Sequence, residues 1–246
     1  MHEITVVAYN PKWPQMFEQE AKNLKEIFGE LAINIHHKGS TSVPNLMAKP
    51  IIDITIEVDD IAMVDQLNQA LSAIGYNAHG EYGMPLRRFF TKGDPRSYHL
   101  HVWDKGHAEI EKDLLFRETL IQNQPARIAY ECLKQKLCEQ HRFEPDKYTL
   151  GKDRLVKEIL RAANYNGLSM VFVLMDSEAE KQAYRKFMEK EPIQDRSLVI
   201  SQGVNFIGAV SLNEKGDIDQ KVISCAHEQA ERLIARWFET RTLPRL

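Results

Sequence analysis

HHKGSTSVP at residues 36–44, followed by KPIID at residues 49–53, is the most informative part of this sequence. Gly39 lies between two predicted strands, where glycine lets the backbone approach a ligand closely. The hydroxyl and amide groups of Ser40 and Thr41 can hold phosphate oxygens. This stretch therefore predicts a phosphate-binding loop.

Asp53 lies among isoleucines on the strand that follows the loop. A carboxylate in such apolar surroundings needs a compensating partner. Asp53 can hold the divalent cation that accompanies a nucleotide. The alternative is that Asp53 lies at a strand end or forms an ion pair with Lys49.

Apolar periodicity around the loop predicts an early sheet and a later layer of helices. Phe17, Leu24 and Phe28 recur at helical spacing before Gly29, as in an amphipathic helix with a glycine stop. The other predicted elements are strands at 4–8, 33–38, 50–58, 86–91 and 97–103, a helix at 61–74, and helices from 108 to 163 with breaks near Pro125 and at 145–151. This part of the chain is predicted to be α+β.

The turn residues at 164–167 predict a boundary between two domains, residues 1–163 and residues 168–246. Strands at 170–175, 197–201 and 204–212 and a helix at 178–189 are predicted beyond it. One side of a predicted final helix carries Val222, Ile223, Ala226, Ala230, Leu233, Ile234 and Trp237. The second domain is expected to be a small β-α-β-β-α unit without a motif for chemistry.

His99 and His101 lie two positions apart on a predicted strand, so both side chains project from the same face. If that strand neighbours the strand of Asp53, the three side chains form a ligand set that suits Zn, Mn or Fe better than Mg. Two alternatives remain open: the histidines bind an anion such as phosphate, or they pack within a polar patch.

Several motifs between the N-terminus and about Ala163 resemble those of the GrpB family, which is placed in the nucleotidyltransferase superfamily. They are YNP at 9–11 with WP at 13–14, HHKGST at 36–41, VP at 43–44, KPIIDI at 49–54, YHLHV at 98–102, FR at 116–117, and Tyr130 with LK at 133–134. The rest of the chain falls outside the resemblance.

The resemblance implies a nucleotidyltransferase-like mixed β-sheet in which Gly39 and Ser40 hold phosphates and Asp53 holds the metal. It also makes Arg117 a candidate for contacting phosphate, for which its planar guanidinium is suited. The candidate phosphate- or nucleotide-binding residues are His37, Gly39, Ser40, Thr41, Lys49 and Arg117. Family members are sometimes fused to dephospho-coenzyme A kinase, which associates the family with coenzyme A metabolism.

One position departs from the superfamily pattern, which typically places a second carboxylate two residues after the first. Thr55 occupies that position. Glu57 lies on the same strand face as Asp53 but about 13 Å away, at about 3.3 Å per residue. The ions of a two-metal site lie about 4 Å apart, so Glu57 cannot replace the missing carboxylate.

Composition excludes several classes of protein. The formal net charge of -3 and the pI near 6.3 disfavour nucleic-acid binding through bulk charge. The three cysteines form no CxxC pair, and neither a signal sequence nor a membrane-spanning run is recognisable, so we expect a cytoplasmic protein with reduced thiols. The absence of a GxxxxGK[ST] loop argues against a P-loop kinase.

The leading hypothesis is a metal-dependent nucleotidyltransferase-like protein acting on a nucleoside triphosphate and an acceptor. Asp53, His99 and His101 would form the catalytic metal site for a divalent Mg, Mn or Zn ion, and Lys49 or Arg117 would neutralise phosphate charge. The alternative is a non-catalytic module that binds a nucleotide or another phosphorylated small molecule, and Thr55 favours it.

Overall fold

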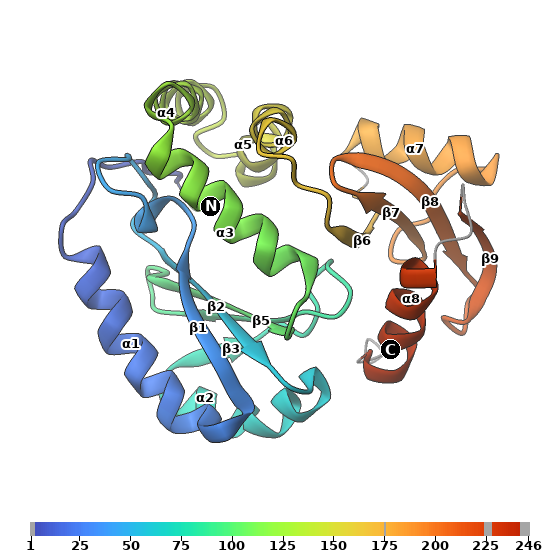
Figure 1. Cartoon of the computed structure of the whole chain (residues 1–246), viewed down its shortest axis with the longest axis horizontal. Coiled ribbons are helices and arrows are strands. Elements are labelled where there is room, and N and C mark those ends of the chain that lie inside the picture. Colours follow the sequence, from blue (N-terminus) through green and yellow to red (C-terminus); the bar gives the residue numbers. More distant parts are fainter. Residues whose placement is uncertain (1–2, 175, 224–227, 242–246) are drawn as a thin grey trace. The chain divides into compact units, whose positions relative to one another are not determined.

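The computed structural model describes residues 3–174, 176–223 and 228–241 of the chain (Figure 1). They form two compact units. The first comprises the chain up to His79 together with Arg88–Tyr165, and the second comprises Gly80–Arg87 together with the chain from Asn166. The chain passes between them after His79, after Arg87 and after Tyr165, and the last of these positions lies within the predicted boundary at 164–167. Independent folding of residues 1–163 stays a prediction.

The first unit is built on a five-stranded sheet with strand order β1-β2-β5-β4-β3. Its strands are β1 (Ala32–Lys38), β2 (Ile52–Val58), β3 (Tyr76–Ala78), β4 (Arg88–Lys92) and β5 (Tyr98–Asp104). β2 and β5 run parallel, whereas the other neighbouring strands are antiparallel. The mixed sheet expected from the sequence is confirmed.

Alternation along β2 gives the sheet an apolar face and a polar face. Ile52, Ile54 and Ile56 are fully buried against helices on the apolar face. These helices are α1 (Trp13–Phe28), the 3-10 helix η3 (Ile61–Leu67) and α2 (Asn68–Ala73). Successive strand side chains point to opposite faces, so Asp53 and Thr55 project from the polar face.

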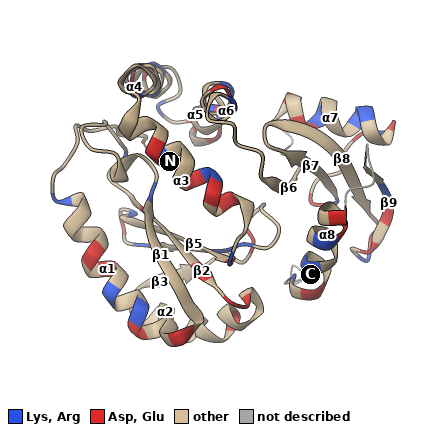
Figure 2. Cartoon of the chain, viewed as in Figure 1, with Lys and Arg blue, Asp and Glu red and all other residues tan. Residues whose placement is uncertain are grey.

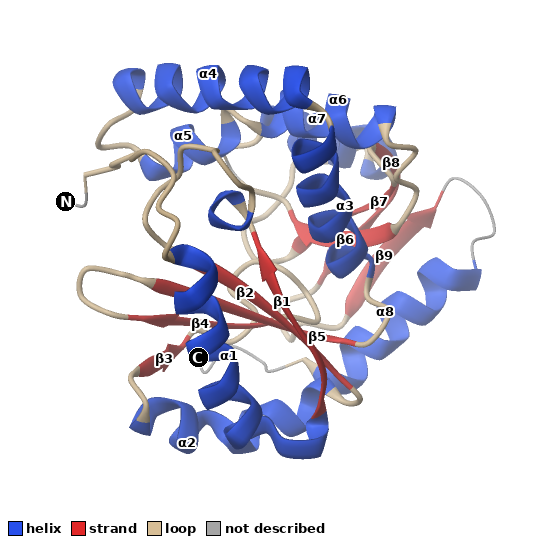
Figure 3. Ribbon diagram, turned by 60° about the vertical axis from the view of Figure 1, so that its left-hand side comes forward, coloured by secondary structure: helices blue, strands red, loops and turns tan. Residues whose placement is uncertain are grey.

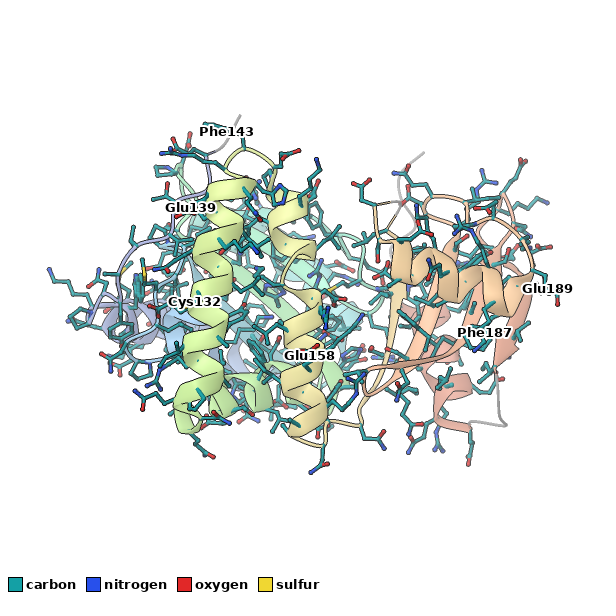
Figure 4. The ribbon with its side chains drawn as sticks, turned by 90° about the horizontal axis from the view of Figure 1, so that it is seen from above. Cys132, Glu139, Phe143, Glu158, Phe187 and Glu189 are labelled. Atoms are coloured by element: carbon teal, nitrogen blue, oxygen red, sulfur yellow. The ribbon has the colours of Figure 1, made fainter. Side chains whose placement is uncertain are left out.

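A second layer of helices covers the polar face. It consists of α3 (Ala108–Gln122), α4 (Gln124–Gln140), α5 (Pro145–Leu150) and α6 (Asp153–Ala162). The ammonium of Lys38 on β1 donates to the carboxylate of Asp113 on α3 at 2.5 Å, which fixes α3 against this face. Figure 3 shows α2 and α4 on opposite sides of the sheet. α4 and α6 lie next to each other and share an apolar cluster with α3 (Figure 4).

The first unit differs from the sequence expectation in four elements, one of which is the break predicted at 145–151, where Pro145–Leu150 forms the helix α5. The strand predicted at 4–8 is a single bridge between Val7 and Ala48, and no further strand pairing extends this bridge within the described residues. The helix predicted at 61–74 begins as the 3-10 helix η3 and becomes α-helical only at Asn68. β3 was not predicted, since a strand of this length carries too few residues to show a period.

The second unit contains a four-stranded antiparallel sheet with strand order β6-β7-β8-β9. Its elements are β6 (Leu168–Phe172), α7 (Glu178–Met188), β7 (Ser197–Gln202), β8 (Asn205–Leu212), β9 (Ile218–Ile223) and α8 (Glu228–Thr240). α7 and α8 belong to separate apolar clusters on the sheet. Within this unit, Leu86 packs in the cluster of α8, and the indole of Trp237 donates to Glu81 at 3.0 Å.

β9 corrects the predicted β-α-β-β-α order to β-α-β-β-β-α. Val222 and Ile223 were assigned to the start of the final helix, but Val222 pairs with Ala209 and Ile223 with Gly208 on β8. The helical spacing read across 222–237 combines the end of a strand with a later helix, an ambiguity that short apolar runs always carry. Ala226 lies outside the described residues.

Charges are mixed along the helices. Figure 2 shows acidic and basic residues interspersed along α1 and α8, with no stripe of one sign on either helix. Among the helices of residues 3–174, 176–223 and 228–241, none is both long enough and apolar enough to cross a membrane.

Candidate metal and phosphate site

The loop after β1 brings its backbone against Asp53. Gly39 has φ +69° and ψ −172°, a conformation that is open essentially only to glycine. A Cβ atom at Gly39 would lie 2.4 Å from Oδ2 of Asp53. Ser40–Ser42 then forms a 3-10 turn, closed by a hydrogen bond from the Ser42 hydroxyl to the Gly39 carbonyl at 2.6 Å. The loop and the carboxylate therefore form one site.

The polar side chains of β2 and β5 meet in this site. The parallel register sets Asp53 opposite His99 and Thr55 opposite His101. Nδ1 of His99 lies 3.0 Å from Oδ1 of Asp53. One ligand atom each from Asp53, His99 and His101 lies within 4.8 Å of the others. β2 and β5 are therefore neighbours, as the predicted cluster of Asp53, His99 and His101 requires.

The donor set of this cluster fits a divalent transition metal. It offers one carboxylate and two imidazoles, ligands that suit Zn, Mn or Fe. Nε2 of His99 is buried, and no hydrogen-bond partner for it occurs within the described ranges. A buried polar atom without a partner is costly, and a metal ion would satisfy it. The contact to Asp53 meanwhile fixes the orientation of the His99 ring, as carboxylates do for metal-binding histidines.

The carboxyl of Asp53 is held in its ionised form. Burial alone would raise its pKa, but the hydrogen bond and charge of His99 and the charges of Lys38 and Lys49 outweigh burial. The pKa of Asp53 therefore lies below its ordinary value. An ionised carboxylate is the form that binds a cation.

His37 shapes the loop as a neutral side chain. Its ring stacks on Phe17 at 4.8 Å between ring centroids, and its Nε2 lies 3.0 Å from Oγ1 of Thr41. Burial lowers the pKa of His37 to about 4, an effect that the charge of Arg117 reinforces and that of Asp53 opposes. His37 and Thr41 thus hold each other within the loop.

Arg117 and Lys49 approach the loop in different ways. The Arg117 guanidinium donates to the carbonyl of His37 at 2.7 Å and to the carboxylate of Glu118 at 2.6 Å. It therefore supports the strand before the loop through the backbone. The Lys49 ammonium lies 5.2 Å from the ring centre of Tyr148 and interacts electrostatically with Asp53. Lys49 thus lies near the candidate metal ligands.

Thr55 and Glu57 lie where their positions on β2 predict, and neither adds a carboxylate beside Asp53. Oε1 of Glu57 lies 2.5 Å from Nε2 of His36, so this carboxylate forms its own pair further along β2. Thr55 is buried, and its hydroxyl has no hydrogen-bond partner in the part of the chain that the structure describes. No second carboxylate from β2 therefore joins Asp53.

Sequence reasoning missed Lys134 and Lys152 as site residues. Lys134 Nζ donates to Ser40 Oγ at 3.2 Å and to the carbonyl of Met47. Lys152 lies over the ring of Tyr148 at 4.6 Å. A signal for Lys134 was present, because it lies four residues after Tyr130 and three before Leu137 on the buried side of α4. A lysine in such a stripe needs an explanation.

The sequence matches the family model described as GrpB protein over residues 3–162. The chain belongs to the GrpB family. The crystal structure of GrpB from Enterococcus faecalis is 40% identical, with a TM-score of 0.62, and the match covers 65% of this chain and 96% of that one. The candidate metal ligands and the loop all lie within the matched region.

Two curated relatives set the scope of the GrpB match. UPF0157 protein YqkA of Bacillus subtilis is 42% identical over 63% of this chain and 46% of its own length. A protein named dephospho-CoA kinase of Mycolicibacterium paratuberculosis is 26% identical over 65% of this chain and 46% of its own length. The chain thus spans less than half of each of these two proteins.

Proposed function

We propose that this GrpB-family chain is a metal-dependent nucleotidyltransferase-like protein that binds a nucleoside triphosphate and transfers its nucleotidyl group to an acceptor. The observation that supports it is the convergence of Asp53, His99 and His101 beside the backbone of Gly39. This arrangement would let the cation ligands and the loop at Gly39 contact one phosphate chain.

Each group would have a separate task in this reaction. A bound divalent cation would polarise a phosphoryl oxygen and stabilise charge that develops during transfer. Asp53 supplies the negative charge of the ligand set, while His99 and His101 supply neutral nitrogen donors. The hydroxyl of Ser40 and the amides of its loop orient phosphate oxygens. Lys49, which interacts electrostatically with Asp53, would offset phosphate charge.

The test is metal binding by the purified full chain, measured by mass spectrometry of the metal content and by titration with Zn²⁺ and Mn²⁺. Asp53→Asn should weaken metal binding by about 100-fold, because it removes the only charged ligand. Glu57→Gln is the matched control, since Glu57 lies on the same strand face but pairs with His36. It should leave the affinity for metal unchanged.

Equal losses in the two variants would place the metal elsewhere and contradict the proposal. Imidazole must be neutral to bind a metal, so affinity should fall as the pH is lowered through the range in which histidines titrate. Metal binding that does not change between pH 8 and pH 5 would remove the histidines from the ligand set.

A second candidate function is a module that binds a nucleotide without catalysis, and Thr55 favours it. Thr55 stands where a second carboxylate would support two-metal transfer, and its hydroxyl is buried. Turnover separates the two functions. A nucleotide that binds in the presence of metal but yields no product with a broad panel of acceptors supports the module. Dephospho-coenzyme A and coenzyme A belong in that panel because of the relative named dephospho-CoA kinase.

A further inference from the structure

Three lysine side chains gather beside the loop from three separate segments. Lys49 precedes β2, Lys134 lies on α4, and Lys152 lies at the start of α6. Lys49 and Lys152 share the ring of Tyr148, at 5.2 and 4.6 Å from its centre. Lys134 reaches Ser40 at 3.2 Å. These three side chains are called the lysine cluster below.

No carboxylate among the described residues forms an ion pair with the lysine cluster. Lys134 is only 2% exposed. Lysine is almost never buried to this extent without a partner, because removing an ammonium from water is expensive. The partners of Lys134 are a hydroxyl, a carbonyl and the face of Tyr130, none of which carries a charge.

The charges around the lysine cluster leave an excess of positive charge. The carboxylates that interact with it electrostatically are those of Asp53 and Glu131. Asp53 already contacts His99, and the carboxylate of Glu131 accepts from the backbone amide of Met47 at 3.2 Å. Arg96 adds a further positive charge near Lys49. The site is therefore suited to an anion of several charges that comes from outside the chain.

We propose that Lys49, Lys134 and Lys152 bind the phosphate chain of the ligand, and that this ligand carries at least two linked phosphates. Orthophosphate has at most about two negative charges at neutral pH and cannot match three ammonium groups. Diphosphate and triphosphate chains can, and lysine binds phosphate as a point charge without a fixed geometry. The inference rests on the proposed function for the position of the nucleotide, but not on metal binding or turnover.

Protonation of the cluster is coupled to anion binding. Burial, reinforced by the charge of Lys152 and opposed by that of Glu131, lowers the pKa of Lys134 to about 7. Burial and Lys49 lower the pKa of Lys152 to about 8, opposed by Asp53. Both lysines are therefore partly neutral above pH 8 in the free protein. A bound polyphosphate raises both pKa values, so binding takes up protons there.

The experiment uses the full chain in EDTA and measures binding of inorganic tripolyphosphate by calorimetry, with orthophosphate as the comparison. Tripolyphosphate should bind with one site and at least about tenfold more tightly than orthophosphate. Lys134→Met and Lys152→Met should each weaken it about tenfold. Lys136→Met is the matched control, because Lys136 is exposed on the same helix as Lys134. It should leave the affinity unchanged.

Titration in two buffers of different ionisation enthalpy gives a second readout. At pH 8.5 the wild type should take up protons on binding tripolyphosphate, and Lys134→Met should take up fewer. At pH 6 the uptake should vanish, because both lysines are already charged. Thermal melts confirm that each variant is folded; Lys134→Met removes a buried charge, so its fold should persist.

Three results would overturn the inference: equal affinity for orthophosphate and tripolyphosphate, equal losses in Lys134→Met and Lys136→Met, or no proton uptake at pH 8.5. Asp53→Asn separates this inference from the proposed function. It should weaken metal binding, yet strengthen binding of tripolyphosphate in EDTA, because a carboxylate near the cluster is neutralised. A chain that binds tripolyphosphate but no metal would contradict the proposed function alone.

Discussion

Residue 39 lies too close to Asp53 to carry a side chain. A methyl group there would meet Oδ2 of Asp53 at 2.4 Å. Gly39→Ala should therefore displace the carboxylate that the candidate metal site requires, and it should also strain a backbone conformation with φ +69°. We expect loss of metal and nucleotide binding together with about 1–3 kcal/mol lower stability. Titration with Zn²⁺ and a thermal melt measure the two effects.

Gly106→Ala provides a control for the backbone effect of Gly39→Ala. Gly106 has φ +73°, but no atom lies within 4 Å of the position that its Cβ would take. Gly106→Ala should lower stability without changing metal affinity. If Gly39→Ala binds metal as tightly as Gly106→Ala does, the close approach has no role in the site.

At this scale the sequence predicted the residues of the sheet but not those of the helical layer. The clustering of Asp53, His99 and His101 could be predicted because strand side chains alternate with a fixed period. Only the identity of the neighbouring strands had to be assumed. The contacts of Lys134 could not be predicted in the same way. Its role depends on how α4 meets the loop at Ser40, and helical periodicity gives the buried side of a helix but not what that side contacts.

α3 begins at a histidine that must stay neutral. Nδ1 of His107 accepts from the amide of Glu109 at 3.3 Å, and its ring stacks on Trp103 at 4.3 Å between centroids. Burial lowers the pKa of His107 to about 4, an effect reinforced by Lys112 and opposed by Glu109 and Asp104. Protonation of Nδ1 would remove the acceptor and the cap.

This cap makes the stability of the first unit depend on pH. The folded pKa of His107 is about 4, whereas an unfolded histidine titrates near 6.5, so the unfolded state binds more protons between these values. The contribution of neutral His107 to the free energy of unfolding is complete above pH 6.5 and is lost as the pH falls toward 4. His107→Asn keeps an N-cap acceptor that does not titrate. It should reduce the loss of unfolding free energy between pH 7 and pH 5 by about 2 kcal/mol.

Urea unfolding at the two pH values measures this difference. The pKa of His37 is also lowered to about 4, so His107→Asn should leave part of the pH dependence in place. An identical pH dependence in His107→Asn and the wild type would show that His107 is not buried as a neutral cap.

Long elements with a clear period were predicted, and short or composite ones were not. α1 and β2 follow their patterns because each buries one continuous stripe. The prolines at residues 125 and 145 set the starts of α4 and α5, since proline is accepted in the first turn of a helix. β9 was missed because Val222 and Ile223 continue the spacing of α8, and only pairing with β8 reveals a strand.

The division into two units allows a prediction of the folding and stability of a shortened chain. Residues 1–163 should fold cooperatively, but residues 1–165 should be more stable by about 3 kcal/mol. The reason is Tyr165, which is 6% exposed and donates its hydroxyl to the carbonyl of Ala108 at 3.1 Å. Thermal melts of the two truncated proteins measure the difference. Loss of cooperative melting in both would show that the first unit depends on the rest of the chain.

Leu86 supplies the control for this truncation. It packs in the apolar cluster of the second unit and is 2% exposed in the full chain. Without residues 166–246 it would face water, so both truncated proteins should expose an apolar side chain. Leu86→Gln should raise their solubility without changing their melting temperature. The same change in the full chain should lower its stability.

The parallel pairing of β2 with β5 also sets when the candidate site can form. Asp53 and His99 are neighbours in space but are separated by 46 residues in sequence. We expect pairings of this kind to form late in folding, because the intervening loop must be closed first. A ligand that needs both strands therefore cannot bind the transition state for folding as well as it binds the native chain. It should slow unfolding in proportion to its affinity and leave the refolding rate unchanged.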